Sequence, residues 1–123
     1  MRTVAEARRK QAEAAGRRAE TLAAWWLRLK GWRILASRVR TPVGEVDLVA
    51  RRGRMVAFVE VKRRATAEEL DFAVDHYRLK RVAAAAEALM PRYVRSTDDA
   101  RIDVILLAPR RWPRHLTHVW QGD

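Results

Sequence analysis

Apolar side chains recur at every third or fourth position from Ala15 to Leu29, within a stretch at residues 4 to 30 that lacks proline and is dense in Ala, Glu, Arg and Leu. This spacing and composition predict a long amphipathic helix that ends near Gly31. A second stretch, roughly residues 76 to 90, has the same period and is followed by Pro91. The apolar stripe predicted for the first helix consists of Ala15, Ala19, Leu22, Ala23, Trp26 and Leu29.

Runs rich in β-branched and aromatic residues, separated by turn signals, predict strands between and after these helices. Thr66, with Glu69 three residues later, predicts a capped loop or short helix at 66 to 73, and Asp75 is expected to cap the second long helix. The resulting order αβββαββ indicates a mixed α/β domain whose central sheet is covered by helices. The predicted strands cover residues 32 to 40, 45 to 50, 55 to 62, 101 to 108 and 115 to 120.

The length of 123 residues and a hydrophobic share of 49% fit a single domain with one core, spanning residues 1 to 123. Residues 1 to 14 are more polar and are expected to form a frayed helical extension. Glu6 and Glu13 argue against a targeting peptide, and no apolar run is long enough to span a bilayer. The absence of cysteine excludes disulfides and thiolate metal sites, and we expect a cytoplasmic protein without a membrane partner.

The net charge of +11, from 26 basic and 15 acidic residues, favours a polyanionic partner. DNA is the expected one, with RNA as the alternative nucleic acid. An anionic membrane surface is the main competing partner. Heavy Arg use can also follow from GC-rich codons. The expected phosphate contacts are Arg51, Arg52, Arg63, Arg64, Arg78, Lys80 and Arg81. Arg54 belongs to the cluster of Arg51 and Arg52, and Arg110, Arg111 and Arg114 form a further basic cluster.

The candidate chemistry lies on the second and third predicted strands. Side chains alternate faces along a strand, so Glu60 shares a face with Lys62. With a two-residue turn at Arg52-Gly53, Glu60 faces Glu45 on the preceding strand. With the turn one residue later, Glu60 faces Asp47. In both registers Asp47, Glu60 and Lys62 fall on one face, with opposed or diagonal side chains roughly 5 to 8 Å apart.

Charges converging on a partly apolar sheet face need a partner, because unpaired buried charge is strongly unfavourable. Asp47 and Glu60 could hold a divalent cation, and Mg²⁺ (or Mn²⁺) fits best because one or two carboxylates and several waters or phosphates complete its shell. Such an ion polarises a phosphodiester and activates water, while Lys62 would stabilise the phosphate's charge. The alternative is a salt bridge from Lys62 to either carboxylate.

These residues resemble the signature of the PD-(D/E)xK nuclease superfamily, an Asp on one strand and E-x-K on the next, with Val46 in place of the usual Pro. More closely, the chain resembles the bacterial family UPF0102 (YraN-like). That family has a helix Glu, then G-E-[IV]-D-L-[IV]-A, F-V-E-V-K-x-R and R-F-D-V. The match covers roughly residues 16 to 108, through Glu20, Gly44 to Ala50, Phe58 to Arg64 and Arg101 to Val104.

The resemblance implies a restriction-endonuclease-like three-layer core, a mixed sheet of αβββαβ type flanked by helices. Similarity of the family to archaeal Holliday-junction resolvases implies that Glu20 completes a metal site with Asp47 and Glu60, beside Lys62. It also implies branched DNA as substrate and a homodimer with two symmetry-related sites. Family members often carry a Lys early in the second helix. Arg78 stands there in this chain, which keeps the charge but does not replace a catalytic Lys.

Two rivals to a metal-dependent endonuclease stay open: a nucleic-acid-binding module without catalysis, and an accessory protein whose basic face meets another partner. Asp103 is expected to pair with an Arg within the sheet. The three histidines, His76, His115 and His118, are expected to be ordinary surface or rim residues. Among the tryptophans, Trp25, Trp26 and Trp32 are expected to pack the first helix on the sheet, while Trp112 and Trp120 are ambiguous.

Overall fold

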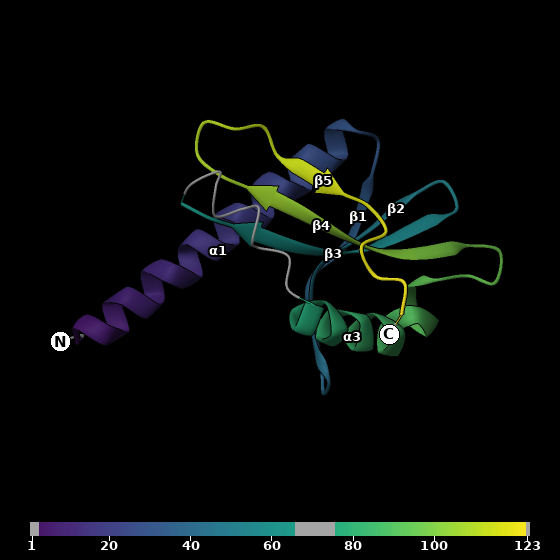
Figure 1. Ribbon diagram of the computed structural model, residues 1–123, viewed down its shortest axis with the longest axis horizontal. Helices are drawn as coiled ribbons and strands as arrows, with labels where there is room; N and C mark the ends of the chain where they lie inside the picture. The colour runs from purple at the N-terminus through teal and green to yellow at the C-terminus, as the bar shows by residue number, and fades with distance from the viewer. Residues whose placement is uncertain (1–2, 66–75, 123) are drawn as a thin grey trace.

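The computed structural model describes residues 3–65 and 76–122 (Figure 1). The helices and strands in these ranges follow the order that the hydrophobic pattern predicts. The short helix or loop predicted at 66 to 73 and the cap at Asp75 lie outside the described residues. The elements are α1 (Val4–Leu29), β1 (Arg33–Thr41), β2 (Gly44–Arg52), β3 (Met55–Arg63), α3 (His76–Tyr93), β4 (Asp99–Leu107) and β5 (Arg114–Leu116).

The strands form one mixed sheet in the order β1-β2-β3-β4-β5. β1, β2 and β3 are joined by antiparallel hairpins, β3 and β4 run parallel, and β5 returns antiparallel beside β4. A parallel pair needs a crossover connection, and α3 lies in the segment between β3 and β4. The predicted mixed α/β architecture is confirmed.

The two helices cover opposite faces of the sheet and produce three layers (Figure 1). On one face, Leu79 of α3 belongs to the same core as Phe58 of β3. On the other face, Leu27 of α1 belongs to a second core with Leu48 of β2. The sheet is therefore buried on both sides, and charged groups on its central strands need specific partners.

The burial of α1 differs from the predicted stripe. Leu22 and Leu29 are 62% and 80% exposed. Residues 4–13 are exposed as well, and this part of the helix projects beyond the sheet (Figure 1). The small side chains let the helix lie close to the sheet, and its longer neighbours then fall on the flank. The buried residues of α1 are Ala15, Ala19, Ala23, Ala24 and Leu27.

No helix within the described ranges is both long and apolar enough to cross a membrane.

Ser37 pairs with Leu48 and Val39 pairs with Val46, so Arg38 of β1 lies opposite Asp47 of β2. Both strands are distorted at this point. Arg38 has a φ of 52°, an unusual value for a residue other than glycine. Val46 packs in the core under α3, whereas Leu48 packs in the core under α1. Residues two apart on a regular strand share a face. The strand therefore turns over at Asp47, which removes this residue from the normal alternation.

Gly44 marks a close approach between β2 and α3. A Cβ at this position would lie 2.9 Å from the carbonyl oxygen of Arg81, closer than a real Cβ approaches backbone. Glycine is therefore the residue that lets the start of β2 pass against α3. This contact brings Glu45, the next residue, beside the basic residues of α3.

The last predicted strand, residues 115 to 120, is shorter in the structure and ends at Leu116. His118 has a φ of 52° and donates its backbone N–H to the Asp103 carboxylate over 3.0 Å. The Val119 amide then bonds the Ile102 carbonyl at 2.8 Å. A buried side-chain acceptor thus replaces the ladder beyond Leu116, an arrangement that strand propensity does not predict.

Candidate functional site

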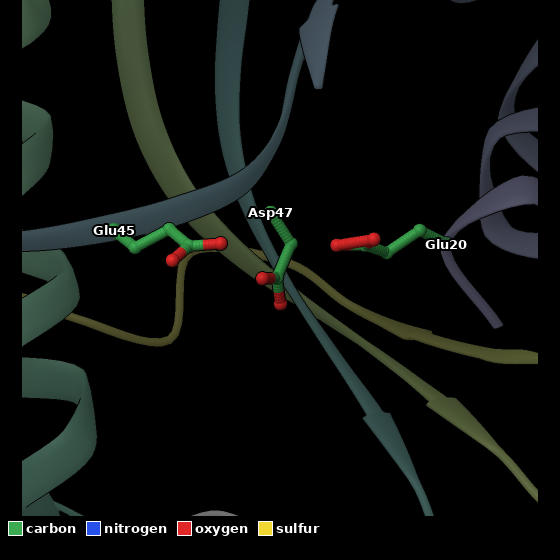
Figure 2. A group of neighbouring side chains, drawn as sticks. All are labelled: Glu20, Glu45 and Asp47. Carbon is green, nitrogen blue, oxygen red and sulfur yellow. The ribbon is translucent and has the colours of Figure 1, made fainter. Parts of the chain in front are cut away.

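Within the described residues, three carboxylates form a group that could hold a metal ion: Glu20 of α1, and Glu45 and Asp47 of β2. Their ligand oxygens lie within 4.8 Å of one another. Figure 2 shows Asp47 between the other two, whose side chains approach it from opposite sides. Carboxylate oxygens are the ligands that Mg²⁺, Mn²⁺ and Ca²⁺ prefer. We call these residues the carboxylate cluster.

Asp47 lies where β2 leaves β3, and its side chain reaches across to the neighbouring strand. Its Oδ2 accepts a hydrogen bond from the Val61 backbone N–H at 2.8 Å. Burial and the charge of Glu60 raise the pKa of Asp47 to about 7, with smaller contributions from the other two members of the cluster. The hydrogen bond from Val61 opposes part of this rise. An Asp whose charge is so unfavourable is a site where a cation stabilises the ionised form.

The E-x-K pair of β3 lies on the α3 face of the sheet and is deeply buried, with Glu60 at 3% and Lys62 at 5% exposure. The Glu60 Oε1 atom bonds the Lys62 Nζ at 3.1 Å and the Arg78 Nη2 at 2.9 Å. Burial lowers the pKa of Lys62, although its bond to Glu60 opposes this. Lys62 is thus a desolvated ammonium paired with Glu60.

The structure therefore brings the expected residues together, but in two groups. Glu20 and Asp47 meet in the carboxylate cluster, where Glu45 takes the position expected for Glu60. Glu60 instead pairs with Lys62 and Arg78. The two groups meet at a cavity of about 290 Å³. Its lining consists of Gly44, Glu45, Asp47, Glu60, Arg78, Arg81 and Val82.

Arg38 is a member of this site that the sequence analysis missed. Its Nε donates to both carboxylate oxygens of Glu20, with 3.1 Å to Oε1. This bond raises the pKa of Arg38, and the charges of Glu45 and Asp47 add to the rise, against the effect of burial. Arg38 is thus the counter-ion of the cluster. It faces Asp47 only because of the distortion in β1, so strand alternation gave no signal for it.

The expected phosphate contacts differ in their exposure and in their partners. Arg63, Lys80 and Arg81 are exposed. Arg64 is half-buried and donates to the backbone carbonyl of Arg63. Two others have internal partners. The Arg51 guanidinium donates to both Asp98 oxygens, at 3.0 and 2.7 Å. The Arg52 guanidinium lies 4.6 Å from the centre of the Trp32 ring. Arg51 therefore stabilises the fold. Arg78 belongs to the candidate site, because its guanidinium bonds Glu60.

Asp103 forms a separate buried network, which confirms the expected pairing with an Arg of the sheet. Its carboxylate accepts from Arg101 Nε at 2.9 Å and contacts His115 Nε2 at 2.7 Å. The expectation that His115 is an ordinary surface or rim residue is wrong, because its side chain is 8% exposed and pairs with Asp103. Burial alone would raise the pKa of Asp103, but the bonds from His115, the His118 backbone and Arg101 outweigh it and lower the pKa.

We expect Arg38→Ala to strengthen binding of Mn²⁺ by about three- to tenfold, because the incoming ion no longer competes with a guanidinium for Glu20. In the presence of EDTA the same variant should unfold at a lower temperature, since the cluster loses its counter-ion. Calorimetric titration and thermal unfolding measure the two effects. Arg33→Ala, an exposed change on the same strand, is the control. Equal or weaker Mn²⁺ binding by Arg38→Ala would show that Arg38 does not occupy the cation's place.

The model of "Uncharacterised protein family UPF0102" matches residues 19–107. A UPF0102 protein of Sphingopyxis alaskensis is 72% identical over 113 residues, covering 92% of this chain and 97% of the relative. One from Rhizorhabdus wittichii is 63% identical over 116 residues, covering 94% and 98%.

Among solved structures, the chain is similar to Hjc of Archaeoglobus fulgidus, a Holliday junction resolvase from an archaeal hyperthermophile. The TM-score is 0.58 at 21% identity, covering 81% of this chain and 73% of that one. At this identity the likeness concerns the fold, and it confirms the expected α/β core with its mixed sheet. The family match spans most of the described fold and contains Glu20, the distorted β2, the E-x-K of β3 and the buried Asp103. This protein therefore belongs to the family UPF0102.

Proposed function

We propose that this protein is a metal-dependent endonuclease that hydrolyses phosphodiester bonds in DNA, with branched or junction DNA as the preferred substrate. The observation that carries the proposal is the carboxylate cluster, which shares a cavity with Glu60, the partner of the buried Lys62, in a chain of net charge +11. Hard oxygen ligands and a phosphate-binding surface are the two requirements of metal-assisted phosphodiester hydrolysis. A DNA substrate also agrees with a cytoplasmic protein.

The donor set fits Mg²⁺ or Mn²⁺. Glu20, Glu45 and Asp47 supply oxygens alone, and these ions are typically held by few carboxylates, with water and phosphate as the remaining ligands. A bound ion would polarise the phosphate and lower the pKa of a water bound to it. Asp47 has to lose its proton to act as a ligand, and its raised pKa makes this loss depend on pH near neutrality.

Other residues would act on the phosphate itself. Lys62, which is buried and paired with Glu60, would stabilise the charge that develops on the scissile phosphate. Arg78 has 59% of its side chain exposed while it bonds Glu60, so it can turn toward a phosphate without unfolding α3. Arg63, Arg64, Lys80 and Arg81 would position the DNA backbone. A junction resolvase needs two sites, so we expect two copies on one junction.

A second function, nucleic-acid binding without catalysis, is favoured by one observation. Glu60, the acidic residue of the E-x-K motif, is occupied by two cationic side chains and lies outside the carboxylate cluster. If these ion pairs persist when DNA binds, Glu60 is not a metal ligand. The protein would then bind nucleic acid in a salt-dependent way and cut nothing.

The deciding experiment offers labelled duplex, single-stranded, flapped and four-way-junction DNA to the protein with Mn²⁺, Mg²⁺ or EDTA. We expect metal-dependent cutting, most rapid on branched substrates, and a loss of about 100-fold or more in Lys62→Met. Lys10→Met removes the same charge from an exposed position of α1 and should cut normally. Binding without cutting would support the second function. Undiminished cutting by Lys62→Met would place the active site elsewhere or indicate a contaminating nuclease.

A further inference from the structure

A large open groove lies on the flank of α1 that faces the ends of β3 and β4, and the proposed function uses only two of its lining residues, Arg63 and Arg64. Its volume is about 740 Å³, and its walls are mostly apolar. We call it the indole groove because three Trp side chains line it. The lining residues are Ala15, Arg18, Ala19, Leu22, Trp25, Trp26, Leu29, Arg63, Arg64, Ala65, Leu107, Ala108, Pro109, Arg111, Trp112 and Pro113.

The aromatic side chains in the groove form a short stack. The rings of Trp26 and Trp112 lie 5.7 Å apart between centroids, at an interplanar angle of 32°. The Lys30 ammonium lies 4.7 Å from the centre of the Trp26 ring. Trp112 is 81% exposed, although it is one of the largest apolar side chains in the protein. The stack is therefore anchored on α1 at one end and open to solvent at the other, where another flat ring could extend it.

Exposed apolar groups continue from the stack along the helix. Trp25 is 58% exposed, and Leu22 and Leu29 are exposed as well. A contiguous apolar surface of this kind usually marks a binding site on a soluble protein. The expectation that Trp25 packs α1 against the sheet is wrong, because the small side chains of the helix occupy that interface.

The charge of the groove favours an anionic occupant. Arg18, Arg63, Arg64 and Arg111 line it, and none of the lining residues is acidic. A second copy of this chain would bring the same arginines face to face, which costs free energy. Arg63 directly follows Lys62 in β3, so one strand carries a residue of the groove and a residue of the proposed active site.

We propose that the indole groove binds an unpaired segment of a DNA strand, with a base stacked on the free face of Trp112 and phosphates held by the surrounding arginines. The inference rests on the proposed function for its substrate class and extends it to single-stranded regions. Stacking on aromatic side chains with phosphates on Arg is a common mode of sequence-independent single-strand binding. Such a subsite would favour flapped or unwound substrates over intact duplex.

Binding is tested without catalysis, in EDTA. A fluorescein-labelled oligo(dT) of 20 nucleotides is titrated with protein at two salt concentrations, beside a duplex of the same length. We expect salt-dependent binding of oligo(dT), quenching of Trp fluorescence, and an affinity about tenfold lower for Trp112→Ala. Trp120→Ala is the matched control, since that ring packs on His76 instead, with 5.0 Å between centroids. Circular dichroism shows whether each variant is folded.

Equal oligo(dT) affinity for Trp112→Ala and the wild type would overturn the proposal. A second result would also overturn it: the protein binds a synthetic acidic peptide rich in Phe and Leu, does not bind oligo(dT), and loses the peptide in Trp112→Ala. The occupant of the groove would then be a protein. The cleavage assay with Mn²⁺ separates this result from the proposed function. Trp112-dependent binding without cutting would support the groove as a binding site for single-stranded DNA and would reject the nuclease activity. Cutting without Trp112-dependent binding would support the nuclease activity and reject this role of the groove.

Discussion

Replacing Asp103 by alanine is expected to destabilise the protein by about 3 to 5 kcal/mol, because removing one partner of a buried ion pair leaves the other uncompensated. The carboxylate is completely buried and accepts from Arg101, His115 and the His118 amide. All three donors would lose their acceptor at once. Urea unfolding at pH 7 measures the change. Asp99→Ala, exposed at the start of the same strand, should change the free energy of unfolding by no more than about 0.5 kcal/mol.

The same carboxylate predicts a pH dependence of definite sign. Its pKa is lowered in the folded state, so it contributes stability above its ordinary pKa of 3.8, and this contribution is lost as pH falls through the lower folded value. Asp103→Asn keeps an acceptor but has no charge. The difference between wild type and Asp103→Asn should therefore be largest near neutral pH and should narrow below about pH 4. An Asn variant as stable as the wild type at pH 7 would show that the charge contributes nothing.

The regular parts of the fold were predictable from the sequence because their local preferences agree with their packing. β3 is a regular strand, so alternation correctly put Glu60 and Lys62 on one face together with Phe58. The hairpin register had two possible values, and the pairing of Leu48 with Val59 selects the one with its turn at Gly53-Arg54. A one-residue difference in turn position decides which residues meet across the strands, and propensity alone does not resolve it.

The division of the candidate site into two groups was not predictable, because it depends on the irregularity of β2. Alternation assigns Asp47 a face that it shares with Glu60. In the structure the strand turns over at Asp47, and Glu45 joins its carboxylate cluster. The distortion involves a positive φ at Arg38, which has no sequence signature in a residue other than Gly, Asn or Asp. The contact between His115 and Asp103 was not predicted for another reason. It joins β5 to β4, and the sequence pattern does not show that these two strands are neighbours.

Asp47→Asn should make the metal-free protein more stable above pH 7, by up to about 4 kcal/mol. The pKa of Asp47 is raised from 3.8 to about 7 in the folded protein. A raised pKa means that the group's contribution to stability is complete below pH 3.8 and is lost as pH rises through about 7. Asparagine stays neutral and still accepts the Val61 N–H, so its advantage over the wild type should be absent near pH 3.5 and grow up to pH 7. Urea unfolding in EDTA across this range measures it.

Asp98→Asn provides a control of opposite sign. Hydrogen bonds from Arg51 and the Arg95 backbone lower the pKa of Asp98 to about 2, so its charge stabilises the fold at neutral pH and Asp98→Asn should be less stable there. A loss of stability in Asp47→Asn at pH 8 would contradict the raised pKa.

The negative charge of Asp47, which destabilises the metal-free protein, should strengthen metal binding. A divalent ion and a proton compete for the Asp47 carboxylate, so the affinity for Mn²⁺ should rise about tenfold per pH unit below pH 7 and level off above it. Asp47→Asn lacks the anionic ligand and should lose most of this affinity. A variant that gains stability while it loses Mn²⁺ binding would identify Asp47 as a residue retained for ion binding at the expense of the fold. Unchanged Mn²⁺ affinity in Asp47→Asn would instead remove the carboxylate cluster from the proposed mechanism.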